Sequence, residues 1–178
     1  MEFEILSTRD LFSGRVFNVR RDHLRYPDGR ETDYDIIVHP GAVAIIPIDA
    51  QEQVWFVRQY RHAAGKYLLE LPAGTLDDGE DPQTCAAREI REEIGYAASE
   101  FKQLGSFFLA PGYSDEFMHV FIATGLSPDP LPADEDEFLQ PVCHPLSEVW
   151  SLLDNGKFED AKTIASLCLA RSSISSRD

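Results

Sequence analysis

The sequence has little cysteine and no long apolar run, and both absences narrow what the protein can be. It contains three widely spaced cysteines, Cys85, Cys143 and Cys168, with no C-x-x-C pair. Such an odd, scattered set argues against a disulfide framework and against a zinc site, so we expect buried free thiols. No apolar stretch approaches the roughly 20 residues of a membrane-spanning helix, and no secretory signal precedes the first strand-like segment. We therefore expect a cytoplasmic protein with no membrane partner.

Positive charge is also scarce. The sequence contains 16 Lys and Arg but 31 Asp and Glu, which gives a formal net charge of −15 at pH 7. Nucleic-acid binding requires a basic surface, so we expect no nucleic-acid partner. A small phosphorylated ligand is still compatible if metal cations or a few arginines meet its charge locally. The 178 residues, 43% hydrophobic and 26% charged, fit one globular domain, or one such domain with a small appendage.

Strand-like runs fill much of the chain. The first two flank the turn signal Pro27-Asp28-Gly29 and predict a β-hairpin. The runs at 41–48 and 53–60 predict a second strand pair, and further strands are expected at 101–110 and 117–126. The two halves of the tail, 145–156 and 158–170, have helical apolar spacing.

The clearest helix signal lies between these strands. Asp81 suits the N-cap, Pro82 suits the first helical position and Gly95 suits the position just past the end. At about 100° per residue, one face of this helix is apolar and should pack on a sheet. The residues of that face are Ala86, Ala87, Ile90 and Ile94.

Carboxylates crowd the other side of the same helix. Glu89, Glu92 and Glu93 fall within about 100° of each other, and like charges at i,i+4 destabilise a helix by roughly 0.2–0.5 kcal/mol. A solvated acidic face, partly neutralised by Arg88, is the ordinary explanation. A glycine-bearing loop that contains Glu80 precedes the helix, and this favours a metal site instead. Mg²⁺ takes oxygen ligands and joins carboxylates to phosphates, whereas zinc would want the histidine cluster that this sequence lacks.

The spacing G-x5-E-x7-R-E-U-x-E-E-x-G-U, with U a bulky apolar residue, runs from Gly74 to Tyr96 and resembles the Nudix box. Tyr96 stands where the pattern usually has an aliphatic residue. The segments VRQYR (57–61), ELPAG (70–74), APGYSDE (110–116) and ADEDE (133–137) are similar to the ADP-ribose pyrophosphatase branch of this family. Pro111, sixteen residues after Gly95, matches a proline of that branch.

The resemblance implies a fold and an assembly. The fold is α/β, a Nudix α/β/α sandwich with a mixed sheet over residues 41–178. An antiparallel β subdomain over residues 1–40 would precede it, swapped in a homodimer and used for dimerisation and for the substrate pocket. The implied reaction is Mg²⁺-dependent hydrolysis of the pyrophosphate bond of ADP-ribose to AMP and ribose 5-phosphate, or of a related ADP-sugar, with Mn²⁺ as an alternative cation.

The resemblance also assigns roles to residues. The implied metal ligands are Glu89, Glu92, Glu93, the carbonyl of Ala73 and, from the acidic loop, Glu137. Arg88 would hold the carboxylates in place. Because bound cations lower the pKa of their glutamate ligands, a general base is expected elsewhere, at Glu135 or Glu137; the alternative is that the loop is a solvated acidic segment.

Substrate contacts are the least constrained part of the prediction. The guanidinium groups of Arg58 and Arg61 could meet phosphate or stack on adenine, and the alternative for each is an ordinary surface charge. The other predicted substrate contacts are Glu70, Pro111 and, from a partner subunit, Arg15 and Val16.

Two competing functions stay open on sequence alone. One is hydrolysis of another nucleotide sugar such as GDP-mannose, because base selection depends on backbone contacts and pocket shape. The other is a non-catalytic Nudix module that senses a nucleotide. The box glutamates Glu80, Glu89, Glu92 and Glu93 are all present, which favours an enzyme over a sensor.

Overall fold

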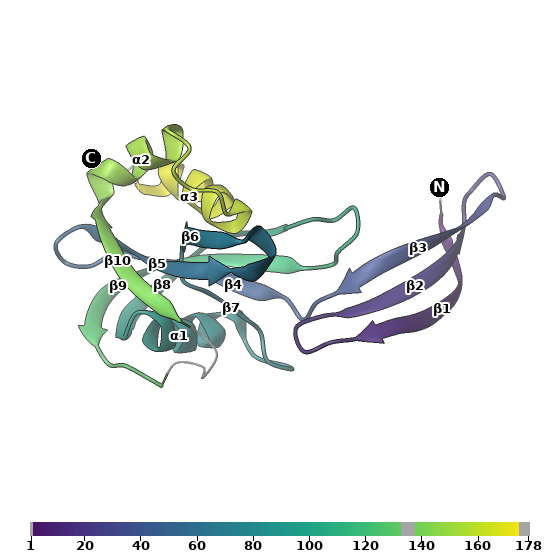
Figure 1. The fold of residues 1–178 in the computed structure, drawn as a ribbon, viewed down its shortest axis with the longest axis horizontal. Helices are drawn as coiled ribbons and strands as arrows, with labels where there is room; N and C mark the ends of the chain where they lie inside the picture. Colours follow the sequence, from purple (N-terminus) through teal and green to yellow (C-terminus); the bar gives the residue numbers. More distant parts are fainter. Residues whose placement is uncertain (1, 133–137, 175–178) are drawn as a thin grey trace. The chain divides into compact units, whose positions relative to one another are not determined.

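The computed structural model describes residues 2–132 and 138–174, which form two compact units (Figure 1). The first unit contains the residues up to Gly41 together with Phe107–Phe117. The second unit contains Ala42–Ser106 and the chain from Met118 onward. No pattern in the sequence predicts that residues 107–117 belong to the same unit as the N-terminal strands.

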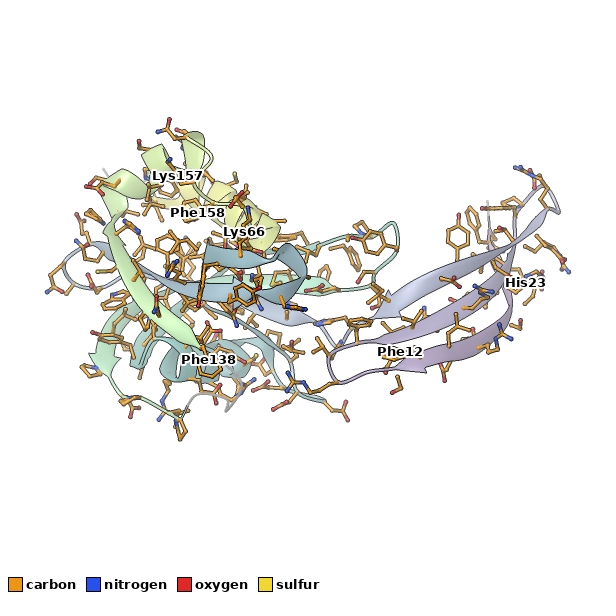
Figure 2. All side chains as sticks on the ribbon, viewed as in Figure 1. Phe12, His23, Lys66, Phe138, Lys157 and Phe158 are labelled. Atoms are coloured by element: carbon orange, nitrogen blue, oxygen red, sulfur yellow. The ribbon has the colours of Figure 1, made fainter. Side chains whose placement is uncertain are left out.

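The first unit is built on an antiparallel sheet in the order β1-β2-β3. Its strands are β1 (Glu4–Ser13), β2 (Asn18–Arg25) and β3 (Glu31–Val38). The predicted hairpin is confirmed: the turn between β2 and β3 closes with the N–H of Gly29 donating to Tyr26 at 2.9 Å, and Gly29 has φ 86°. Ion pairs then cross the β2–β3 ladder, such as Arg21 with Asp35 and His23 with Asp33 (His23 is labelled in Figure 2).

The second unit contains two sheets. The four-stranded sheet, ordered β7-β4-β9-β8, consists of β4 (Ala42–Pro47), β7 (Ala73–Thr75), β8 (Tyr96–Phe108) and β9 (Phe117–Pro128). The three-stranded sheet, ordered β10-β5-β6, consists of β5 (Gln53–Arg61), β6 (Lys66–Glu70) and β10 (Leu139–Pro145). A short 3-10 helix, His62–Ala64, joins β5 to β6. Because β4 pairs parallel with β9 and antiparallel with β7, the four-stranded sheet is mixed, as expected.

The predicted strand pair of 41–48 with 53–60 is wrong. Both segments are strands, but β4 and β5 belong to different sheets and share only an isolated bridge between Ile48 and Val54. The reason is burial. All six residues of β4 are buried, which is typical of a central strand with a parallel neighbour rather than of half of an exposed hairpin.

In the described part of the second unit, three α-helices cover the two sheets. In the second unit, α1 (Pro82–Glu93) lies on one side, and α2 (Leu146–Asp154) and α3 (Ala161–Ile174) lie on the other (Figure 1). The core under α1 contains Val43, Ile45, Val57, Cys85, Ala86 and Ile90. On the opposite side Phe158, labelled in Figure 2, stacks on Phe56 with ring centroids 5.2 Å apart. All three predicted helices are therefore confirmed.

The cysteines divide between interior and surface. Cys85 is buried under α1, but Cys143 on β10 and Cys168 on α3 are exposed, so the expectation of buried thiols holds for Cys85 alone. Spacing along the chain does not reveal which side of an edge strand or of a helix meets solvent. Among the described residues, no helix is long and apolar enough to cross a membrane.

Candidate functional site

Helix α1 begins at a fixed point because its N-terminus is capped. The carboxylate of Asp81 accepts hydrogen bonds from the N–H groups of Gln83 and Thr84, each at 3.1 Å. Pro82 occupies the first helical position, where its missing N–H costs nothing. Gly95 follows the helix with φ 78°, a conformation that favours glycine. These local signals fix which carboxylates of α1 face the β7 strand.

A single guanidinium joins three carboxylates beside α1. Arg88 Nη1 donates to Glu89 at 2.6 Å and to Glu92 at 2.9 Å, while its Nε and Nη2 donate to Glu80 at 3.2 and 3.0 Å. Hydrogen bonding to Glu80 raises the pKa of Arg88, and the same contact lowers the pKa of the Glu80 carboxyl. We call Glu80, Glu89, Glu92 and Glu93 with Arg88 the acidic cluster.

The acidic face of α1 is buried rather than solvated. Glu89 is 8% exposed and Glu93 is 5% exposed. Glu93 Oε2 accepts the backbone N–H of Ala73 at 3.0 Å, which ties α1 to β7. A Cβ on Gly74 would lie 1.9 Å from the carboxyl carbon of Glu89, so any larger residue here would force the Glu89 carboxylate to move.

The donors of the acidic cluster fit a hard divalent cation. Three of its four carboxylates share one arginine, which leaves an excess of negative charge in a partly buried place. Within the described ranges, no three acidic, His or Cys side chains already converge as a closed metal cage. Mg²⁺ needs no such cage, because it commonly takes one or two protein carboxylates and fills its other positions with water and phosphate. Carboxylate oxygens also suit Mn²⁺, whereas zinc prefers nitrogen and sulfur.

A second charged group lies at the end of β5. Arg61 donates from Nε and Nη2 to the two oxygens of Glu70, each at 2.8 Å. Lys162, from α3, donates to the same carboxylate and also pairs with Asp160 at 3.0 Å. We call Arg61, Glu70, Lys162 and Asp160 the Glu70 network.

Glu70 is the most deeply buried carboxylate of the described chain, with 1% of its surface exposed. Burial pushes the pKa of Glu70 up, but its bonds to Arg61 and Lys162 outweigh this and hold the pKa below its ordinary value. Both oxygens are therefore engaged by protein cations. The predicted contact of Glu70 with the substrate stays a prediction. In the structure, Glu70 binds the side chains of Arg61 and Lys162. Sequence reasoning missed Lys162, because 92 residues separate it from Glu70 and no motif marks it.

Arg58 lies apart from these groups. Alternation along β5 directs Arg58 and Arg61 to opposite faces of the strand. The guanidinium of Arg58 lies 4.3 Å from the ring centroid of Tyr67, and its Nη1 donates to Gln140 at 3.2 Å. The structure therefore does not bring Arg58 to the acidic cluster.

The remaining predicted site residues belong to the first unit or are not among the described residues. Arg15 and Val16 belong to the first unit, where they line a hollow of about 320 Å³ together with Phe17, Asn18, Val38 and His39. Pro111 also belongs to the first unit, within Phe107–Phe117. Glu135 and Glu137, the predicted bases, lie outside the described residues.

Two family descriptions match the chain in succession. The "Nucleoside diphosphate sugar hydrolase N-terminal domain" matches residues 3–37, and the NUDIX domain matches residues 38–167. A methanol dehydrogenase activator of Bacillus methanolicus is 38% identical over 165 residues, covering 92% of this chain and 89% of that protein. An ADP-ribose pyrophosphatase of Bacillus subtilis (strain 168) is 33% identical over 165 residues with the same coverage. A crystal structure of an ADP compounds hydrolase superposes with a TM-score of 0.89 at 29% identity, over 99% of this chain and 96% of that one.

Proposed function

The chain belongs to the NUDIX domain family, and from that premise we propose that it hydrolyses the pyrophosphate bond of ADP-ribose, giving AMP and ribose 5-phosphate, or that of a related ADP-sugar. The observation that carries the proposal is the acidic cluster, in which three of the four glutamates share Arg88 while Glu89 and Glu93 are buried. The substrate is supported by the names of relatives that align over most of this chain, an ADP-ribose pyrophosphatase and an ADP compounds hydrolase.

Glu89 and Glu93, with Glu92, the carbonyl of Ala73 and Glu137, would hold Mg²⁺ or Mn²⁺, which when bound neutralises pyrophosphate charge and acidifies a coordinated water. Arg88 keeps Glu89 and Glu92 in place through its hydrogen bonds. Hydrolysis forms a bond between the water oxygen and one phosphorus and breaks the bond from that phosphorus to the bridging oxygen.

Arg61 is the described cation best arranged to hold the substrate. Its Nε and Nη2 each donate one hydrogen bond to Glu70, which leaves three of its five N–H donors. Those donors would bind a phosphate oxygen and keep the pyrophosphate oriented during the reaction.

A glutamate of the acidic loop would accept the proton of the attacking water. Glu135 and Glu137 are the candidates. Glu135→Gln or Glu137→Gln should lower kcat by about 10²–10⁴-fold at the true base, the usual contribution of general base catalysis. Asp136→Asn in the same loop is the matched control. If both glutamine variants keep nearly wild-type kcat, the base lies elsewhere.

We also propose that the protein acts as a homodimer in which the partner's Arg15 and Val16 complete the adenine pocket. Support comes from large apolar side chains at the surface of the first unit, with Phe12 55% exposed, Val16 52% and Phe17 40%. Exposed apolar groups of this size mark interaction surfaces. Light scattering after size exclusion should give twice the 20.0 kDa chain mass. A monomer that is fully active would contradict this assembly.

One assay tests the proposed reaction. The pure protein is incubated with Mg²⁺ and ADP-ribose, ADP-glucose or GDP-mannose, and the products are separated and quantified. We expect AMP and ribose 5-phosphate, with the highest kcat/KM for ADP-ribose. Faster turnover of GDP-mannose would overturn the assignment of adenine as the preferred nucleobase. Inertness toward all three, with tight binding of one, would favour the sensing module over the enzyme.

A further inference from the structure

The pair between Arg61 and Glu70 is asymmetric. The Glu70 side chain is 1% exposed, whereas that of Arg61 is 42% exposed. The carboxylate is therefore fixed inside the protein and the guanidinium reaches outward from it. A bidentate contact also fixes the plane of the guanidinium, because two parallel hydrogen bonds leave it little freedom to rotate.

A second cation lies on the other side of this carboxylate. Lys162 is 12% exposed and bonds both Glu70 and Asp160. Asp160 Oδ2 in turn accepts the N–H of Thr163 at 2.9 Å and its hydroxyl at 2.7 Å at the start of α3. Lys162 thus ties Glu70 to the capped first turn of a helix, which is a rigid support.

Arg61 lies on the side of β5 that faces α1. Val57 packs in the core with Cys85, Ala86 and Ile90 of α1, and strand alternation directs Arg61 to the same side as Val57. Hydrogen bonding to Glu70 raises the pKa of Arg61, and the charge of Glu93 contributes in the same direction. Arg61 therefore lies on the same side of β5 as α1, the helix that carries three of the carboxylates of the acidic cluster.

We propose that Glu70 and Lys162 are positioning residues that hold the guanidinium of Arg61 beside the acidic cluster, with its remaining N–H donors kept for a substrate phosphate. This inference rests on the proposed function. Lys162 shares the Glu70 carboxylate with Arg61, and Asp160 balances the charge of Lys162, so the network is neutral overall. Arg61 would therefore meet an anion through its remaining N–H donors, which the bidentate contact with Glu70 holds in a fixed direction.

The test compares Lys162→Met with Lys162→Arg, which keeps the charge. We expect Lys162→Met to raise KM for ADP-ribose roughly 10-fold with kcat within about 2-fold, because contacts to non-reacting phosphate oxygens act as uniform binding. Lys162→Arg should stay within about 3-fold of the wild type in KM. Lys66→Met is the matched control: Lys66 (Figure 2) pairs with Arg61 in the backbone register of β5 and β6, but its side chain makes an exposed bridge to Glu159 at 2.7 Å.

A double-mutant cycle separates positioning from general structural support. In an Arg61→Ala background, Lys162→Met should change KM by less than about 2-fold, because no guanidinium remains to be positioned. A full effect of Lys162→Met in that background would overturn the proposal, and so would an unchanged KM in the single variant. If Lys162→Met does not fold, Glu70→Gln carries the same cycle with the same expected results.

Binding of inorganic pyrophosphate with Mg²⁺, measured by calorimetry, distinguishes the two ways of failing. An inert wild type would overturn the proposed function, but a roughly 10-fold weaker Kd in Lys162→Met would still support the positioning role. An active wild type with equal pyrophosphate affinity in Lys162→Met and Lys66→Met would overturn the positioning role alone.

Discussion

The acidic cluster and the Glu70 network differ in how many carboxylates they hold for each cation. In the acidic cluster one arginine bonds three glutamates, whereas in the Glu70 network one glutamate bonds an arginine and a lysine. The first has too little positive charge for its own carboxylates. The second supplies two cations to its central carboxylate and leaves N–H donors on Arg61. One is arranged to take up cations, and the other is arranged to hold an anion.

The two clusters also differ in how the chain builds them. The acidic cluster comes from a loop and a helix within residues 80–93, so its contacts are local. The Glu70 network joins β5 and β6 to α3, across 92 residues between Glu70 and Lys162. Crowded buried carboxylates weaken the fold on their own, and a fold accepts such strain where a ligand relieves it. The comparison thus predicts opposite responses to substitution.

The largest expected effect is that of Glu93→Gln. The amide oxygen keeps an acceptor for the N–H of Ala73, but the variant removes a cation-binding charge. We expect kcat/KM to fall by more than about 100-fold. This exceeds the loss of roughly 10–100-fold that is typical when a residue supporting a metal ligand is replaced. The free energy of unfolding in EDTA should stay the same or rise, because repulsion is relieved. Retained activity, or clear destabilisation, would break the comparison.

Arg88→Met should be the most damaging change to stability. It removes the cation shared by Glu80, Glu89 and Glu92, and we expect a loss of about 3 kcal/mol in free energy of unfolding, as for a broken, largely buried ion pair. Added Mg²⁺ should restore part of this loss, since it supplies positive charge. Denaturant titrations with and without Mg²⁺ measure both.

The matched control for Arg88 is Arg91→Met. Arg91 pairs with the exposed Asp129 at 3.0 Å, so its loss should cost less than about 1 kcal/mol. If the two variants lose equal stability, or if Mg²⁺ restores neither, Arg88 is not the internal counterion of the acidic cluster.

Glu70→Gln should cost about 2 kcal/mol at pH 7, because it leaves Arg61 and Lys162 without a charged acceptor. The pKa of Glu70 is lowered in the folded state, so its stabilisation is fully present above the unfolded pKa of about 4.3 and is lost as pH falls through the lower folded pKa. The stability difference between wild type and variant should therefore stay constant from pH 7 to about 5 and shrink below about pH 4. A difference independent of pH down to the acid transition would contradict the ion pair.

Glu80→Gln should have the smallest effect on catalysis. Glu80 bonds Arg88 from the loop side, and Arg88 keeps its contacts to Glu89 and Glu92 without it. We expect kcat to fall by no more than about 10-fold, as for a supporting residue behind the ligands. A loss as large as that of Glu93→Gln would mean that Glu80 binds the cation itself.

The acidic cluster could be predicted from the sequence more fully than the sheets, because its contacts join residues that are close together in the chain. Asp81, Pro82 and Gly95 act on their own helix, so α1 and its carboxylates follow from a short segment. The prediction for β4 was wrong because it paired this strand with the next strand in sequence. The parallel partner of β4 is β9, which lies far along the chain. Burial of Glu89 and Glu93 also escaped prediction, because it depends on how β7 approaches α1.

The Glu70 network shows the same limit. Arg61 and Glu70 were predicted as site residues because they resemble a family pattern. Their mutual bonds, and the part taken by Lys162, depend on how α3 packs against β6. A lysine in a helix of the C-terminal region has no pattern that would mark it.

Binding of Mn²⁺, followed by the loss of its free electron paramagnetic resonance signal, tests the central claim that the acidic cluster takes up divalent cations. The account predicts saturable binding to the wild type, competition by Mg²⁺, and affinity at least about 10-fold weaker in Glu93→Gln and Glu89→Gln but unchanged in Lys66→Met. Saturable binding of equal affinity in all four proteins, or no saturable binding to the wild type, would contradict it.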